Sequence, residues 1–191
     1  MSKAKRLDQF VGLSALLTGF GPVHLVGTGM AEAYLRSADA ALPAGVLDEL
    51  LVAFARLEAI PARPGGTTQP GGPDLEAAAG QAILGDAKLG PVARALILLW
   101  YRGTWTVLPQ EWRAAHGGSP QDADHVVSAE AYQAGLQWDA AGAHPAGARQ
   151  QGYGAWASPP AALETESLPV AAAVWLPGQA DAPSVPEGSR S

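Results

Sequence analysis

The feature that most constrains the fold is the spacing of the apolar residues, which recur every three or four positions in several separate segments. The clearest case is one continuous stripe formed by Leu47, Leu50, Leu51, Phe54 and Leu57. Such spacing places residues on one face of an α-helix. No strict alternation of apolar and polar residues extends beyond a few positions, and no strand–helix–strand rhythm appears. The sequence therefore predicts an all-α fold.

Residues that start and stop helices bound the predicted segments. Glycine accepts the left-handed conformation that ends a helix, which places helix ends at Gly19 and Gly103. Pro43 suits the first turn of the helix that carries the stripe, and Asp74 and Ser128 suit the caps of later helices. Pro91 is expected to begin another helix. Besides the helix that carries the stripe, helices are predicted over residues 7–17, 26–38, 74–84, 91–102 and 128–136.

The second of these helices carries two further local signals. Glu32 and Arg36 lie four residues apart, and this spacing predicts a supporting ion pair on the helix surface. The run Gly27-Thr28-Gly29 has neither a preceding strand nor a following Gly-Lys-Ser/Thr, so it is interpreted as a turn and not as a phosphate-binding loop.

Proline and glycine divide the chain into one domain and irregular segments. Eight of the thirteen residues from Pro61 to Pro73 are Pro or Gly, which predicts a mobile loop. Residues 1–160 are expected to form a small irregular helical domain, with a long extended C-terminal arm from about residue 138. Residues 161–191 are rich in Ala, Pro and Ser and are predicted to be a tail that is flexible or ordered by a partner.

Charge and composition exclude several classes of protein. The formal net charge is −6, and only 12 basic residues are spread along the chain, which argues against binding of nucleic acid. The absence of cysteine excludes disulfides, thiolate nucleophiles and iron–sulfur clusters. The sequence contains no run of eighteen apolar residues, so no transmembrane helix is predicted. Asp8 interrupts the basic N-terminal stretch. That stretch is therefore interpreted as part of an amphipathic first helix and not as a signal peptide.

The polar side chains form no recognisable catalytic pattern. Ser14 and Ser128 lack the G-x-S-x-G elbow and are interpreted as a helix-surface residue and an N-cap. The carboxylates of Asp122, Asp124 and Glu130 are expected to be solvated loop groups. The histidines lack the three- or four-residue spacing that places two metal ligands on one helix face: His24, His116, His125 and His144.

Aromatic residues crowd one stretch of the chain, which holds five of the six tryptophans. Large aromatic side chains serve as core residues or as interface anchors. Burial preference favours the core for Trp100, whereas Trp138, Tyr153 and Trp156 lie in a stretch broken by Gly and Pro that favours an interface. The stretch contains Trp100, Tyr101, Trp105, Trp112, Tyr132, Trp138, Tyr153 and Trp156.

Four segments together resemble one family. They are the L-S-x-x-x-T-G pattern at 13–19, the W-Y-x-G pattern at 100–103, the run 127–138, and the closing Y-G-x-W-A-x-P-P pattern at 153–160. In this order they resemble the small (gamma) subunit of bacterial membrane-bound FAD-dependent sugar and polyol dehydrogenases, such as those that oxidise sorbitol, fructose or glucose. That small subunit is similar to gluconate 2-dehydrogenase subunit 3. The resemblance covers residues 7 to 160.

The resemblance implies a helical subunit that carries no cofactor and performs no catalysis. It would bind, stabilise and help mature a catalytic subunit of the glucose-methanol-choline (GMC) oxidoreductase type, which holds the FAD, with a multihaem cytochrome c as an optional further partner. The expected partner interface comprises Trp100, Tyr101, Trp105, Trp112, Tyr132, Trp138, His144, Tyr153, Trp156 and Pro159. The arm that holds Trp138, His144, Tyr153 and Trp156 is expected to lie over the catalytic subunit.

Two alternatives stay open at this stage. The aromatic cluster also suits a self-sufficient helical enzyme or sugar-binding protein that stacks its ligand on the rings. The resemblance implies a periplasmic complex associated with the membrane, but the chain departs from the family pattern because no twin-arginine signal is visible. That departure leaves room for a cytoplasmic location and for a role as a maturation chaperone of the flavoprotein.

Overall fold

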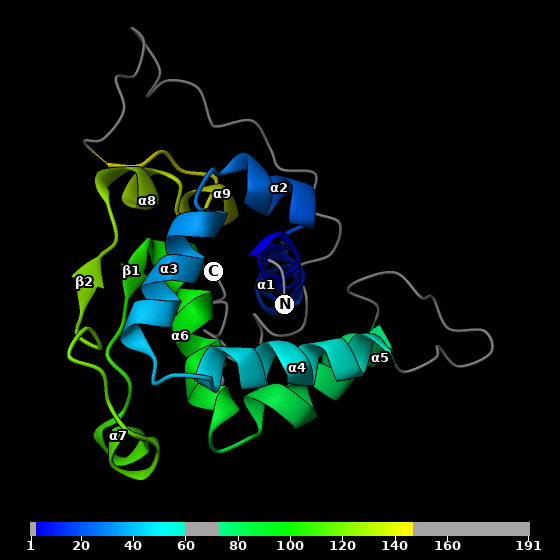
Figure 1. Cartoon of the computed structure of the whole chain (residues 1–191). Coiled ribbons are helices and arrows are strands. Elements are labelled where there is room, and N and C mark those ends of the chain that lie inside the picture. Colours follow the sequence, from blue (N-terminus) through cyan, green and yellow to red (C-terminus); the bar gives the residue numbers. More distant parts are fainter. Residues whose placement is uncertain (1–2, 60–72, 147–191) are drawn as a thin grey trace, which may run out of the picture.

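The computed structural model describes residues 3–59 and 73–146, and these form a helical domain with one very short β-ribbon (Figure 1). In chain order the elements are α1 (Lys3–Thr18), α2 (Pro22–Gly27), α3 (Ala31–Ala41), α4 (Val46–Glu58), α5 (Pro73–Ala79), the π-helix η1 (Gly80–Leu84), α6 (Leu89–Arg102), β1 (Thr104–Trp105), α7 (Gln110–His116), β2 (His125–Val126), α8 (Ala129–Gln133) and α9 (Leu136–Ala140). The predicted all-α class is confirmed. None of the described helices is long and apolar enough to cross a bilayer.

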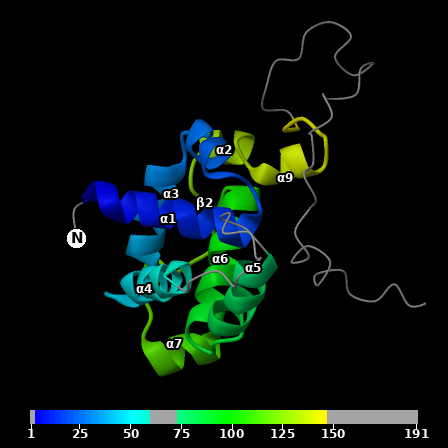
Figure 2. The same cartoon turned by 90° about the vertical axis from the view of Figure 1, so that its right-hand side faces the viewer.

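Helix α1 is the central element of the domain. It contacts α2, α3, α4 and α6, which surround it when the molecule is viewed along its axis (Figure 1). In the perpendicular view α1 runs between α2 and the α4–α6 layer (Figure 2). Phe10 of α1 stacks on Trp100 of α6 with ring centroids 6.3 Å apart, and Tyr34 of α3 meets the same indole edge-on at 4.8 Å. Aromatic pairs in these arrangements stabilise a core beyond their buried area.

Most predicted helices are present, and their differences from expectation have local causes. The apolar stripe is confirmed in α4, but the helix begins at Val46 because Gly45 in front of it is left-handed, with φ +86°. Pro43 therefore precedes the helix. Helix α6 begins at Leu89, before Pro91, because the Asp86 carboxylate accepts hydrogen bonds from the backbone N–H groups of Lys88 and Leu89.

The single helix predicted over 26–38 is wrong, because the chain forms α2 and α3 with a turn between them. Gly29 has φ +72°, and the Thr28 hydroxyl donates to the Leu25 carbonyl and accepts from the Met30 N–H. These bonds form the C-terminal end of α2, so the turn predicted at residues 27–29 is confirmed. The predicted pair of Glu32 and Arg36 is confirmed at 3.9 Å.

The later helices differ in a similar way. Helix α5 begins at Pro73, so Asp74 lies inside it and is not its cap, and the segment continues as the π-helix η1. Ser128 caps α8 as predicted, with its hydroxyl oxygen accepting the Ala131 N–H at 3.0 Å. The single helix expected over 128–136 is divided, because Gly135 is extended and α9 begins after it at Leu136.

The predicted extended arm is wrong at its start, because Trp138 lies within helix α9. The predicted loop at 61–73 falls almost wholly outside the described residues, as do the arm beyond 146 and the tail at 161–191. The antiparallel pairing of β1 with β2, in which Trp105 faces His125, was not predicted. Two residues are too few to show an alternating pattern.

An ion-pair cluster joins three helices on one side of the domain. The Arg6 guanidinium of α1 donates two hydrogen bonds to Asp39 of α3, one of them 2.6 Å long, and one of 2.8 Å to Asp48 of α4. The bond to Asp39 raises the pKa of the Arg6 guanidinium above its usual value, although partial burial acts in the opposite direction. Because the pairing is bidentate, this cluster stabilises the helix arrangement more than a typical surface pair does.

We expect Arg6→Ala to lower the free energy of unfolding by about 1–2 kcal/mol, since it removes charge-assisted bonds to two helices. The matched control is Lys3→Ala, because Lys3 is highly exposed and lies 3.8 Å from its partner Glu32. That control is expected to change stability by less than about 0.5 kcal/mol. Urea titration followed by circular dichroism measures both values, and equal losses in the two variants would contradict the role given to Arg6.

Candidate partner-docking face

Three of the predicted interface residues are core residues instead. Trp100 and Trp105 are fully buried in the domain, and Trp112 is almost so. The Trp112 indole N–H donates to the Lys88 carbonyl at 2.7 Å. Helix α7, which carries Trp112, lies at the end of the molecule opposite to α8 and α9 (Figure 1). A side chain enclosed by its own chain offers no surface to a partner. The expectation that Trp100, Trp105 and Trp112 contact a partner is therefore wrong.

Four other predicted interface residues lie near one another at the α8–α9 end. The rings of Tyr132 and Trp138 meet edge-on at 5.4 Å, and the Trp138 indole N–H donates to the Tyr132 carbonyl at 2.8 Å. Tyr132 and Trp138 are partly exposed, as is Tyr101, and His144 is exposed. Tyr153, Trp156 and Pro159 lie outside the described residues. This end of the domain is the part of the structure in which the predicted interface residues remain accessible.

Of the four segments on which the family resemblance rests, the three that lie within the described residues converge at the same end. The Tyr101 hydroxyl of the W-Y-x-G pattern donates to the carbonyl of Thr18, in the L-S-x-x-x-T-G pattern, at 3.0 Å. Burial raises the pKa of the Tyr101 phenol, which keeps this donor protonated. A side chain on Gly103 would place its Cβ 2.3 Å from the Ala131 carbonyl, and a Cβ on Gly135 would lie 2.7 Å from the Tyr101 carbonyl. The glycines of both segments therefore allow close backbone contact.

Ser14, in the first of these patterns, was expected on a helix surface but is fully buried. Its backbone carbonyl accepts the Thr18 hydroxyl at 2.7 Å. A small residue at this position lets α1 pack closely against its neighbours, which explains a serine on the inner side of the helix.

Helix α2 adds an apolar surface beside these residues. Val23 and Val26 are 87% and 59% exposed. Their neighbour His24 lies 3.0 Å from the Asp139 carboxylate of α9, and this contact joins α2 to α9. Phe20 lies between His24 and Tyr101, with ring centroids 5.0 and 6.0 Å away. We call the surface formed by Phe20, Val23, His24, Val26 and Trp138 the α2–α9 face.

A short pattern in the sequence indicates this face. Val23 and Val26 are three residues apart in a short segment between Pro22 and Gly27, and both point away from the core while Leu25 is buried. Exposed valines on a helix so close to aromatic residues form the kind of patch that marks an interaction site.

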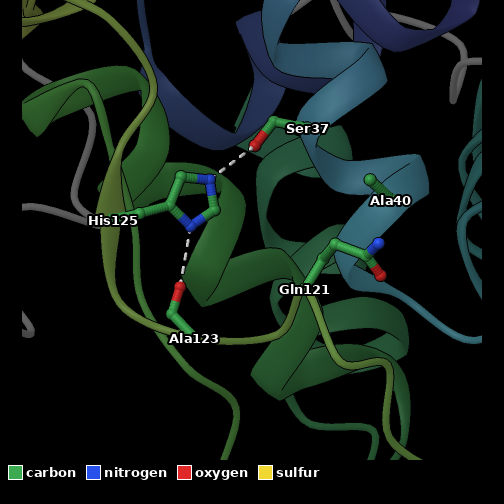
Figure 3. Close-up of a pocket in the computed structure, with 5 residues that line it drawn as sticks. All are labelled: Ser37, Ala40, Gln121, Ala123 and His125. Atoms are coloured by element: carbon green, nitrogen blue, oxygen red, sulfur yellow. Dashed lines mark hydrogen bonds between the residues drawn. The ribbon is translucent and has the colours of Figure 1, made fainter.

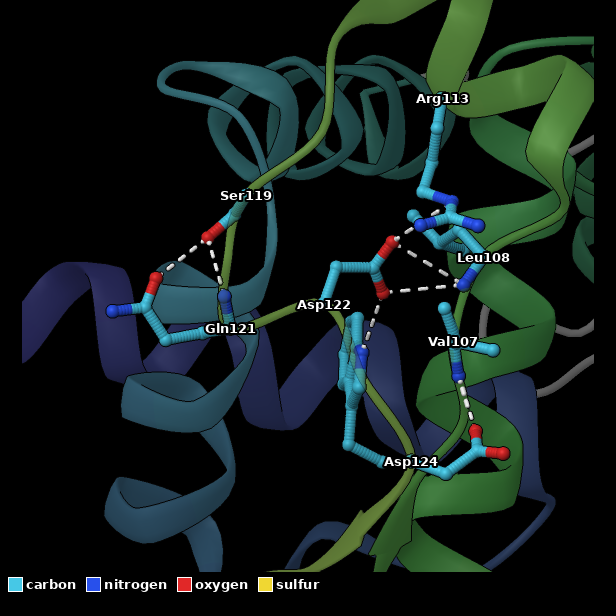
Figure 4. A network of polar contacts seen from close by, with 8 residues as sticks. Val107, Leu108, Arg113, Ser119, Gln121, Asp122 and Asp124 are labelled. Carbon is cyan, nitrogen blue, oxygen red and sulfur yellow. Dashed lines mark hydrogen bonds and ion pairs between the residues drawn. The ribbon is translucent and has the colours of Figure 1, made fainter.

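A buried carboxylate fixes the segment that precedes β2 (Figure 4). Asp122 is only 5% exposed and accepts hydrogen bonds from the Trp105 indole N–H at 2.9 Å and the Leu108 backbone N–H at 3.1 Å. The expectation that Asp122 is solvated is therefore wrong, because its loop folds inward over β1. Asp124 is exposed as predicted, and it accepts the Val107 N–H at 2.7 Å. Glu130 is also exposed, as predicted.

The same segment forms one wall of an open hollow against α3 (Figure 3). The hollow has a volume of about 370 Å³ and is lined by Ser37, Ala40, Gln121, Ala123 and His125. Next to the hollow the Ser119 hydroxyl lies 2.7 Å from the Ala40 carbonyl oxygen, which brings this segment against α3. Ser37 and Gln121 were not among the predicted site residues.

Within residues 3–59 and 73–146 no three His, Asp or Glu side chains come together in an arrangement that could hold a metal ion. The four histidines lie apart, with His24 next to Asp139 and His125 next to Ser37. Comparison with known proteins gave no match to any family model, curated protein or solved structure.

Proposed function

We propose that this chain is a non-catalytic small subunit that binds, stabilises and helps mature an FAD-dependent GMC-type sugar or alcohol dehydrogenase. The observation that carries the proposal is the convergence of the 13–19, 100–103 and 127–138 segments at the α2–α9 face. These segments are the ones that resemble the small-subunit family. They contact one another, and the Phe20 ring links Tyr101 to His24, the neighbour of the exposed Val23. The flavin chemistry would belong to the partner.

The energetics of the α2–α9 face suit a protein partner. Burying an exposed valine side chain stabilises an association by about 1.5–3 kcal/mol. The partly exposed aromatic rings add further contact area, and they lose little side-chain entropy when a partner covers them. Obligate interfaces are large and apolar, so this face would be the centre of a wider contact. Ala146 also lies at this end of the domain, since the Tyr132 hydroxyl donates to the Ala146 carbonyl at 3.3 Å.

The double substitution Val23→Asp with Val26→Asp is expected to weaken binding to the co-expressed flavoprotein at least tenfold, because it places two charges in the apolar contact. The matched control is Val52→Asp on α4, since Val52 is 46% exposed but lies away from the α2–α9 face. Binding is measured by affinity capture of a tagged chain and by surface plasmon resonance. Unchanged affinity in the double variant, or an equal loss in the control, would contradict docking through this face.

Co-expression tests the role in maturation. The flavoprotein produced with the chain is expected to contain more FAD per polypeptide and more soluble protein than the flavoprotein produced alone. Equal FAD content and solubility would remove the maturation role. The composition of the purified mature enzyme distinguishes a subunit from a maturation chaperone. A subunit would remain in the purified enzyme, whereas a chaperone would be missing from it.

A further inference from the structure

The imidazole of His125 is held in one tautomer at the hollow between α3 and β2 (Figure 3). Its Nδ1 lies 2.8 Å from the Ala123 carbonyl oxygen, which can only accept a hydrogen bond. In the neutral ring Nδ1 therefore carries the proton and Nε2 carries a lone pair. Nε2 lies 3.5 Å from the Ser37 hydroxyl oxygen. The Ser37 hydroxyl is thus the donor and the imidazole the acceptor.

We propose that Ser37 and His125 form a nucleophile–base pair that hydrolyses small activated esters in this hollow. A base next to a serine hydroxyl, oriented in turn by a third group, is the arrangement that activates a serine nucleophile. Here the third group is the Ala123 carbonyl, in the place that a carboxylate holds in a Ser-His-Asp triad. The Ser37–His125 distance is at the long end for a hydrogen bond, and such bonds shorten when substrate binds.

The surrounding contacts hold His125 over α3. The Asp124 carboxylate accepts the Val107 N–H at 2.7 Å, and β2 pairs with β1 through Trp105 and His125. On the other side of the hollow the Ser119 hydroxyl binds the Ala40 carbonyl. These bonds fix the 119–126 segment at both ends, so the imidazole is positioned before any ligand arrives.

Gln121 also lines the hollow. Its side-chain oxygen lies 2.7 Å from the Ser119 hydroxyl, whose single proton goes either to this oxygen or to the Ala40 carbonyl. The amide points away from Ser37 and His125 (Figure 3), so the proposed chemistry is carried by the pair and not by Gln121. The small side chains of Ala40 and Ala123 leave room for a short acyl group.

The reaction balances without a cofactor. The Ser37 oxygen attacks the ester carbonyl while its proton passes to Nε2 of His125. The tetrahedral intermediate then expels the alcohol, which takes that proton, and Ser37 is left acylated. Water attacks the acyl-serine with His125 again as the base, and the carboxylic acid and free Ser37 are released. This activity is separate from the proposed subunit function, in which the chain takes no part in the flavin chemistry, because it uses α3 and β2 instead of α2 and α9.

The test uses the full chain with p-nitrophenyl acetate and a fluorophosphonate probe. We expect Ser37→Ala and His125→Gln each to lower the rate of p-nitrophenol release at least tenfold, while His116→Gln, which removes another partly exposed imidazole, retains the wild-type rate. The probe is expected to add one covalent label, located on Ser37 by peptide mass spectrometry. Melting temperatures show that the variants fold, and both changes lie at the surface, where a substitution is tolerated.

Two results would overturn the inference. A wild-type rate in Ser37→Ala would show that exposed imidazoles alone hydrolyse the ester. Failure of the probe to label Ser37 in the folded wild-type chain would show that the hydroxyl is not activated.

Discussion

Replacing Gly103 with alanine is expected to lower the free energy of unfolding by about 2–5 kcal/mol, the sum of a conformational cost and a steric cost. Gly103 ends α6 in the left-handed conformation, with φ +66°. An added Cβ would lie 2.3 Å from the Ala131 carbonyl oxygen and 2.8 Å from the Tyr132 nitrogen. These are backbone atoms, so the contact is relieved only if α8 moves away from α6.

Gly29→Ala separates the two costs. Gly29 is also left-handed, with φ +72°, but an added Cβ would meet no atom within 4 Å. This control is expected to cost about 1–2 kcal/mol, which is the conformational part alone. Urea unfolding of both variants measures the difference. Equal midpoints for the two variants would show that the close contact between α6 and α8 contributes nothing to stability.

Asp122→Ala is expected to lower the free energy of unfolding by about 2–4 kcal/mol, because it leaves two buried donors without an acceptor. These donors are the Trp105 indole N–H and the Leu108 backbone N–H. For a chain of this length the loss corresponds to a fall of about 4–16 °C in melting temperature. Trp105 fluorescence is also expected to change, since its indole loses its hydrogen-bond acceptor.

Two further variants test the cause. Asp124→Ala removes a carboxylate from the same loop that is exposed and accepts one backbone N–H, so it is expected to cost less than about 1 kcal/mol. Asp122→Asn keeps one side-chain oxygen as an acceptor and is expected to recover part of the loss. If Asp122→Ala and Asp124→Ala destabilised the chain equally, burial of the Asp122 carboxylate would not be the reason.

The sequence predicted the helices correctly where the pattern that defines them involves only neighbouring residues. The stripe of α4 and the stops at Gly19 and Gly103 depend on neighbouring residues only, and they are confirmed. The Gly27-Thr28-Gly29 run also marks the break between α2 and α3. The single helix predicted over 26–38 did not take this break into account.

The candidate sites were harder to predict because they depend on contacts between distant segments. Asp122 is buried by Trp105, seventeen residues earlier, and a loop carboxylate in isolation gives no sign of such a partner. Ser37 and His125 are 88 residues apart, and no short motif joins them. The glycine and proline near Trp138 favoured an extended segment. In the structure the buried Leu136 packs the short helix α9 against the core. In these cases tertiary packing overrides local preference.

The contacts between the first helices and the last ones determine when parts of the fold can form during synthesis. His24 bonds to Asp139, 115 residues later, and Tyr34 bonds to the carbonyl of Ala131, 97 residues later. A chain emerging from the ribosome cannot complete the surroundings of α2 and α3 until α8 and α9 have left the exit tunnel. Long-range closures of this kind slow folding relative to a simple helical bundle. Nascent chains would therefore expose apolar surface for most of their translation, when chaperones bind such surface.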